Sequence, residues 1–203
     1  MVYAAAYWAK SKNDEISKMG FNGDSFPLPS FSDSKQLSAV QRTHLLGSID
    51  AKDSIGYVIR TLSPKEISAN MLQTSLLWKS VIRSVPFNLN EMSHKAAMDM
   101  IRELLRMNIR VKEVYIDTVG SAEKYEAKLR AAFNFTTIKF TVSAKGDALF
   151  KCVSAASIVA KVLARTMIIA RLTVMPSSLT INGKSPICET RVSEIKDQDI
   201  LQV

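Results

Sequence analysis

The stretch Val-Lys-Glu-Val-Tyr-Ile-Asp-Thr-Val-Gly, residues 111–120, decides the fold class. Val111, Val114, Tyr115 and Ile116 are β-branched or aromatic residues, which favour a pleated and mostly buried strand. The run ends in a carboxylate, Asp117, and a glycine follows three residues later. The pattern therefore predicts a strand with Asp117 at its C-terminal edge.

A helix is expected directly after this strand. Ser121 is a suitable N-cap, and Tyr125, Leu129 and Phe133 share one face at helical spacing. Strand, short turn and helix form the unit of an α/β sheet, whose ligand sites lie beyond the carboxyl ends of strands. Asp117 is thus the first candidate for chemistry, and the alternative is an ordinary turn aspartate.

The composition is that of a folded protein with a basic surface. Of 203 residues, 47% are hydrophobic and 23% charged, which disfavours a disordered chain. Lys and Arg total 27 against 19 Asp and Glu, and the formal charge of +8 favours a polyanionic partner such as nucleic acid. Aromatic residues make up only 7%, so the sequence does not predict a stacking platform for single strands.

Cysteine and histidine usage argues against a zinc site. Cys152 and Cys188 have no ligand spacing, and His44 and His94 lie far apart, so a reducing compartment fits better than a disulfide framework. No uninterrupted apolar run of 18 residues is present, which predicts no membrane span. The start of the chain has no basic segment typical of a signal peptide. A buried strand that begins at residue 2 suggests that a segment precedes it.

Local patterns predict the remaining elements. Strands are expected at 2–9, 54–62 and 137–142, and a long surface loop at 10–32. Helices are expected at 39–46 after a capping box, from Pro64, within 71–85, after a Ser93 cap, and at 152–172. Residues 1–172 are expected to form one core, and 173–203 a poorly ordered tail.

Seven segments in the same order resemble one family. They are Met1-Val-Tyr-Ala, Asp33-Ser-Lys, Leu62-Ser-Pro, Asn88-Leu-Asn with Ser93-His94, Asp117-Thr-Val-Gly, Lys145-x-Asp147-Ala-Leu, and Val153-Ser-Ala-Ala-Ser-Ile with Ala160-Lys-Val. The chain resembles the ribonuclease HII family, on the branch of the eukaryotic type 2 ribonuclease H catalytic chains. The resemblance covers residues 1 to about 165.

The resemblance implies a ribonuclease H-like fold, a mixed α/β sheet flanked by helices. It also implies an endoribonuclease that cuts RNA in RNA–DNA hybrids and 5′ of ribonucleotides in duplex DNA. The implied chemistry is phosphodiester hydrolysis with two metal ions, Mg²⁺ or Mn²⁺, which are hard cations suited to carboxylate ligands. Accessory B and C subunits are implied as well, together with a nuclear location.

The resemblance also assigns roles to single residues. Asp117 falls on the family's central catalytic and metal-binding aspartate. Lys35 and Lys145 are expected to contact nucleic acid, although a solvated lysine is the alternative for Lys35. Supporting roles are expected for Asp33, Ser34, Asp147, Ser154 and Ser157, with a loop or capping role favoured for Asp147. His94 is expected to be a helix-start residue that its neighbours satisfy.

Three departures from the family pattern concern the site. The family's first strand, Asp-Glu-Ala-Gly-Arg-Gly, would lie just before Met1. The fourth family carboxylate falls on Arg165 or Thr166, and no match to the junction tyrosine is found beyond residue 173. One family metal ligand therefore remains. The alternative to an active nuclease is a catalytically inactive truncated isoform that binds nucleic acid or partner subunits.

Overall fold

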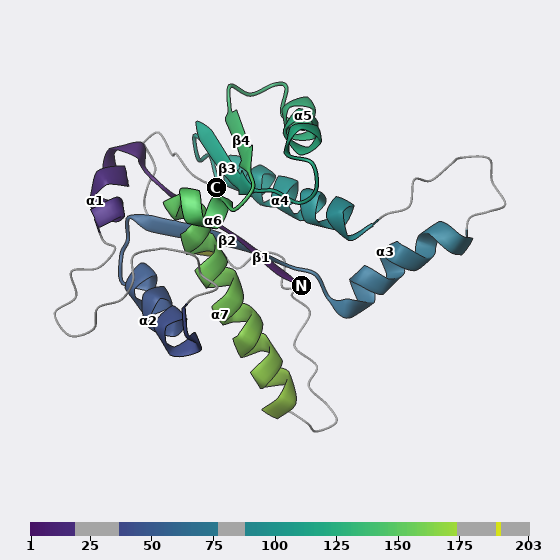
Figure 1. The fold of residues 1–203 in the computed structure, drawn as a ribbon, viewed down its shortest axis with the longest axis horizontal. Helices are drawn as coiled ribbons and strands as arrows, with labels where there is room; N and C mark the ends of the chain where they lie inside the picture. Colours follow the sequence, from purple (N-terminus) through teal and green to yellow (C-terminus); the bar gives the residue numbers. More distant parts are fainter. Residues whose placement is uncertain (19–36, 77–87, 174–189, 192–203) are drawn as a thin grey trace.

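The computed structural model describes residues 1–18, 37–76, 88–173 and 190–191 (Figure 1). The elements in chain order are β1 (Val2–Trp8), η1 (Lys10–Lys12), α1 (Asn13–Lys18), α2 (Ala39–Asp50), β2 (Ile55–Thr61), α3 (Pro64–Leu76), α4 (Leu89–Arg106), β3 (Glu113–Asp117), α5 (Ala122–Ala132), β4 (Lys139–Ser143), α6 (Gly146–Leu149), α7 (Lys151–Thr173) and β5 (Thr190–Arg191). The predicted mixed α/β class is confirmed.

One small sheet has the strand order β1-β2-β5. β1 and β2 pair antiparallel without a slip, from Val2 opposite Thr61 to Trp8 opposite Ile55. Tyr7 lies opposite Gly56, and a Cβ at position 56 would come within 2.3 Å of the Tyr7 ring. Glycine is therefore needed at position 56, because the tyrosine ring lies across its backbone.

A second sheet contains β3 and β4, which run parallel and pair from Glu113–Lys139 to Asp117–Ser143. Parallel neighbours need a crossover, and α5 supplies it. The sequence prediction of one mixed sheet with Asp117 on a central strand differs from the structure. In the described residues the strands form two sheets, and β3 is paired along one edge.

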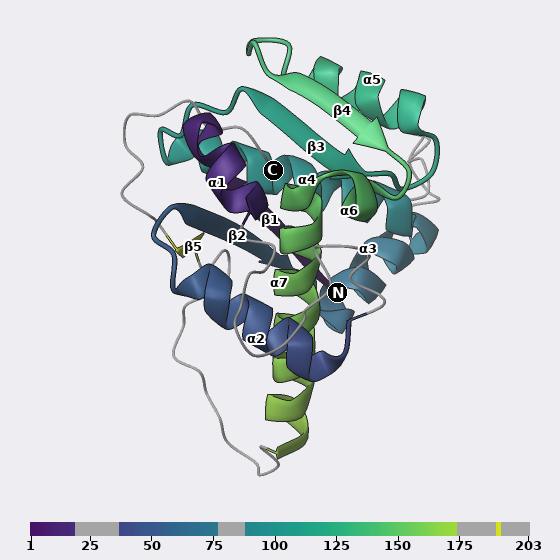
Figure 2. The same ribbon diagram turned by 60° about the vertical axis from the view of Figure 1, so that its left-hand side comes forward.

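Both sheets nevertheless lie in one layer between two layers of helices (Figure 2). Alternate residues of β1 enter different cores: Ala5 and Tyr7 pack with α4 and α5, whereas Ala6 and Trp8 pack with α2 and α7. β3 alternates in the same way, with Val114 in the first core and Tyr115 against the second. A strand buried on both faces reads as a continuous apolar run, which explains its sequence.

Most helix boundaries follow from local capping signals. The predicted capping box is confirmed, since Gln41 N donates to Ser38 Oγ at 3.2 Å and Ser38 N donates to Gln41 Oε1 at 2.7 Å. At Pro64 the cap is Ser63, whose Oγ accepts from Glu66 N at 3.1 Å. Both helices thus begin where a side chain satisfies a free backbone N–H.

Two local predictions were wrong. Ser93 does not cap α4: that helix begins five residues earlier at Asn88, whose Oδ1 accepts from Glu91 N at 2.9 Å. Ser93 lies inside the helix, where its Oγ donates to Leu89 O at 2.9 Å. The loop expected at 10–32 begins with η1 and α1, and its remainder lies outside the described residues.

The long helix α7 confirms the prediction for 152–172 and packs against β1 and α2. By length and composition alone, its segment Lys151–Ile169 could cross a membrane, with a mean hydropathy of 1.7. One such helix is weak evidence, because a core helix has the same composition, and 33% of this segment is buried. The proposed division at residue 172 stays a prediction, since beyond Thr173 only Thr190 and Arg191 are described.

Candidate active site

Asp117 lies at the C-terminal end of β3, as the sequence predicts. The strand is anchored by Val114, which is fully buried, and the ladder continues one bond beyond Asp117, where Thr118 N donates to Ser143 O at 3.0 Å. The Asp117 side chain itself is exposed. The end of the strand is therefore fixed while its carboxylate stays accessible.

The turn after β4 holds this carboxylate from behind. Gly146 N donates to Asp117 Oδ1 at 2.9 Å. A Cβ at position 146 would lie 3.2 Å from Asp117 Cα and 3.3 Å from Asp117 N, so glycine permits the close approach of the two backbones. Lys145 enters the turn in the left-handed region, with φ of 58°. These contacts orient Asp117 by main-chain geometry rather than by another side chain.

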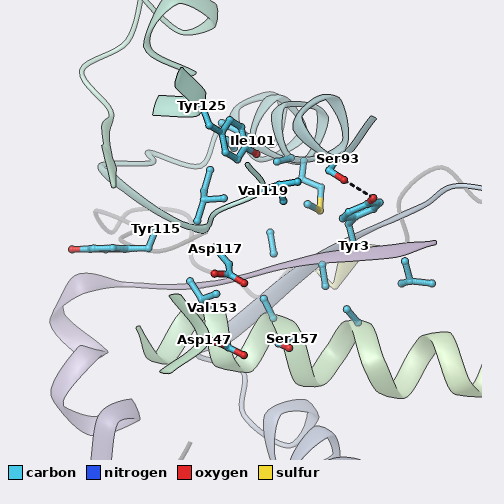
Figure 3. A pocket seen from close by; sticks show the side chains of 18 residues that line it. Tyr3, Ser93, Ile101, Tyr115, Asp117, Val119, Tyr125, Asp147, Val153 and Ser157 are labelled. Atoms are coloured by element: carbon cyan, nitrogen blue, oxygen red, sulfur yellow. Dashed lines mark hydrogen bonds between the residues drawn. The ribbon is translucent and has the colours of Figure 1, made fainter. Parts of the chain in front are cut away.

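A second carboxylate borders the same space. Asp147 follows in the first turn of α6 and is 8% exposed. It does not occupy the helix N-cap position, which is Lys145. Asp117 and Asp147 both line one cavity, and Figure 3 shows them at the same end of it.

That cavity has a volume of about 260 Å³ and lies between the two sheets. β1 and β3 line its sides, α4 lines one face and α7 the other. Its lining residues are Val2, Tyr3, Ala4, Ala5, Ser93, Ala97, Met100, Ile101, Tyr115, Ile116, Asp117, Val119, Tyr125, Asp147, Val153, Ala156, Ser157 and Ala160. At the end away from the carboxylates, Tyr3 Oη and Ser93 Oγ are hydrogen-bonded at 2.9 Å across the space between β1 and α4 (Figure 3).

His94 holds the loop that follows Asp117, a role that the sequence argument missed. It is 8% exposed, and its Nε2–H donates to the Val119 carbonyl at 3.1 Å. Its ring stacks on Tyr125 with centroids 3.8 Å apart and planes at 18°. The histidine is thus not at the helix start but in the second turn of α4, facing the site loop. Only the tertiary contact with α5 reveals this role.

An ion pair fastens the same helices beside His94. Lys128 of α5 donates to Glu91 Oε2 of α4, and this hydrogen bond is the main reason why the pKa of the Glu91 carboxyl is held below its usual value. The pair is partly exposed, so its contribution to stability is small, about 0–1 kcal/mol. Its role is to fix the α4–α5 contact on which the loop after Asp117 rests.

The other predicted site residues divide into two groups. Asp33, Ser34 and Lys35 lie outside the described residues. Lys145 is exposed at the α6 N-cap, and Ser157 lines the cavity. Ser154 is completely buried on α7, and its Oγ has no hydrogen-bond partner in the described part of the chain.

The described residues do not by themselves fit a pair of divalent ions. In the described ranges no group of three or more His, Cys, Asp or Glu side chains comes together as a metal site. Asp117 Oδ1 already accepts the Gly146 hydrogen bond, and Asp147 is the one further carboxylate that lines the cavity. Arg165 and Thr166 are exposed on α7 and are not among the cavity-lining residues.

The geometry defines an α/β protein with a carboxylate site at the end of a parallel strand, beside a cavity between two sheets. The family model of ribonuclease HII matches residues 1–200, so the chain belongs to the ribonuclease HII family. Members of this family depend in general on divalent metal ions. The family predicted from the seven sequence segments is therefore confirmed.

The curated relatives are catalytic chains of ribonuclease H2. The Arabidopsis thaliana protein is 38% identical over 162 residues, which are 80% of this chain and 47% of the relative. The Caenorhabditis elegans protein is 37% identical over 80% of this chain and 48% of its own length. The human protein is 40% identical over 64% and 40%, respectively. The chain thus spans about half the length of the curated relatives it matches.

Solved structures support the fold. An RNase HII from Archaeoglobus fulgidus, solved in complex with PCNA, matches with a TM-score of 0.58 and 22% identity, over 85% of this chain and 67% of the other. The ribonuclease H2 of Pyrococcus horikoshii matches with a TM-score of 0.56 and 21% identity, over 85% and 76%. The two small sheets and their helices are therefore a recognisable ribonuclease HII architecture.

Proposed function

We propose that this chain carries the active-site core of a ribonuclease H-type endoribonuclease. The substrates are the RNA strand of RNA–DNA hybrids and the 5′ side of single ribonucleotides in duplex DNA. The single observation that carries the proposal is the Asp117 carboxylate, which is exposed at the end of β3 and oriented by the Gly146 amide.

Asp117 is the proposed ligand for a catalytic divalent ion, Mg²⁺ or Mn²⁺. Phosphodiester hydrolysis of this class requires positioning and neutralisation of charge more than covalent help, and two ions normally supply it. Asp117 and Asp147 are too few to hold two ions, so the remaining carboxylates are assigned to residues outside the described ranges or to additional polypeptide. Asp33, in the segment Asp33-Ser-Lys, keeps its proposed supporting role.

The positive charge of the chain supports a nucleic-acid substrate. The formal charge of +8 favours a phosphate backbone, and Lys145 is exposed in the turn that approaches Asp117, next to the Gly146 contact. Lys35 is proposed as a second backbone contact. Assembly with accessory B and C subunits and location in the nucleus complete the proposal by analogy with the family.

The test is cleavage of a labelled duplex that contains one ribonucleotide, with Mg²⁺ or Mn²⁺. The chain by itself is expected to be inactive, because its carboxylates do not complete a two-ion site. Adding Asp-Glu-Ala-Gly-Arg-Gly before Met1, together with Arg165→Asp or Thr166→Asp, is expected to produce metal-dependent nicking.

Two variants of that extended protein assign the activity to the site. Asp117→Asn removes a ligand charge at nearly constant size and is expected to abolish nicking while the circular dichroism spectrum is unchanged. The matched control is Asp99→Asn on α4, whose carboxylate pairs with Arg102 away from the cavity, and it is expected to leave nicking intact. Full activity in Asp117→Asn would show that this carboxylate is a turn residue and that the proposal is wrong.

A further inference from the structure

The cavity beside Asp117 is bordered by two strand edges. In the described part of the chain, β1 has one strand neighbour, β2, and β3 has one, β4. Val2–Ala5 of β1 and Tyr115–Asp117 of β3 line the cavity from opposite sides. An edge without a neighbour presents a row of backbone donors and acceptors, which is a template for another strand.

The two faces of this space are already covered. Ala97, Met100 and Ile101 of α4 close one face, and Val153, Ala156 and Ala160 of α7 close the other. The same helix layers cover both sheets, since alternate residues of β1 and of β3 enter the two cores. The strand layer is therefore continuous in its packing but interrupted in its hydrogen bonding at this cavity.

We propose that this cavity binds one extended peptide segment in trans, which pairs with β1 on one side and with β3 on the other. Figure 2 shows β1 and β3 running in opposite directions, so a segment parallel to β3 is antiparallel to β1. Both are regular ladders, and a helix or a globular ligand would satisfy neither edge. Binding of this kind is β-augmentation on two edges at once.

The lining sets the chemistry of the bound segment. Because helices cover both faces, its side chains are expected to be apolar on both sides and not alternating, as in a strand of a buried parallel sheet. The small residues Ala97, Ala156 and Ala160 leave room for β-branched side chains. Polar or charged residues fit only at the ends, near Tyr3 and Ser93 or near the two carboxylates.

The test uses a synthetic peptide, Lys-Val-Val-Ala-Val-Val-Lys, capped at both ends and labelled with fluorescein. Fluorescence anisotropy measures its binding to the purified chain. The matched control peptide has the same sequence with N-methyl groups on alternate residues, which blocks one hydrogen-bonding edge without changing the side chains. The expected result is saturable binding that is at least about tenfold weaker for the methylated peptide.

Two variants of the chain locate the binding. Ala160→Leu fills the cavity from α7 and is expected to weaken binding at least about tenfold. Ala164→Leu, one turn further along the same helix and not among the lining residues, is the matched control and is expected to leave binding unchanged. Hydrogen exchange is expected to slow at residues 2–5 and 115–117 when the peptide is bound.

Three results would overturn the inference. Equal binding of the methylated peptide would show that only apolar contact is involved, and unaltered binding to Ala160→Leu would place the peptide elsewhere. Self-association in sedimentation experiments that Ala160→Leu abolishes would make a second copy of the chain the occupant. None of these experiments measures cleavage, so the failure of this inference and that of the proposed function are distinguishable.

Discussion

Gly146→Ala tests the contact that orients Asp117. The added Cβ would lie 3.2 Å from Asp117 Cα, 3.3 Å from its N and 3.5 Å from its Cβ. Two of these three atoms are main-chain atoms, so the turn or the end of β3 must move by a few tenths of an ångström. Overpacking of this kind costs about 1–3 kcal/mol, and the entropic advantage of alanine offsets about 0.5–1 kcal/mol of it. The expected net loss is about 1–2 kcal/mol.

Urea unfolding, followed by circular dichroism, measures this loss. With a slope of about 1–3 kcal/mol per molar urea, the midpoint of Gly146→Ala is expected to fall by roughly 0.5–1 M. The matched control is Gly47→Ala in α2, where a Cβ meets no heavy atom within 4 Å. Alanine there is expected to stabilise the chain by about 0.5–1 kcal/mol. If Gly146→Ala is as stable as Gly47→Ala, the close approach of the turn to Asp117 does not exist.

Two further predictions concern buried groups of α7. Burial raises the pKa of the Cys152 thiol to about 12, so in a Cys188→Ser variant Ellman's reagent is expected to react only at the rate of unfolding, and a rapid reaction in the native state would contradict the packing. Because this pKa lies above the unfolded value of 9.0, the contribution of the thiol to stability is complete below pH 9 and is lost as the pH rises toward 12. Ser154→Ala removes a buried hydroxyl that has no partner in the described residues, so its free energy of unfolding in urea is expected to be unchanged or higher, by roughly 1 kcal/mol at most; a clear loss would reveal a missing hydrogen bond.

The sequence predicts well the features that depend on neighbouring residues. The caps at Ser38 and Ser63 are local hydrogen bonds, and the β-branched run before Asp117 forms a strand because no partner contact is needed to recognise it. The predicted start of α4 at Ser93 failed for a related reason. Ser93 has the residue type of a cap, but Asn88 satisfies the helix N-terminus earlier, and the Ser93 hydroxyl bonds to Leu89 O and Tyr3 Oη instead.

Features that join distant segments were not predictable from local patterns. The contact between Asp117 and Gly146 bridges 29 residues, and the hydrogen bond from His94 to Val119 bridges 25. Neither leaves a periodic signal. The division of the strands into two sheets is of the same kind, because pairing depends on which edges meet in space and not on the β propensity of each strand.

The cavity links the catalytic proposal to the binding proposal through strand direction. Sites in open parallel sheets lie beyond the carboxyl ends of the strands, and Asp117 occupies that position on β3. A segment that enters the cavity parallel to β3 ends beside Asp117 and Asp147, so its last side chains would join the two carboxylates. A segment of the opposite direction would end near Tyr3 and Ser93, far from them in Figure 3. The direction of the bound segment therefore decides whether it only stabilises the fold or also contributes groups to the site.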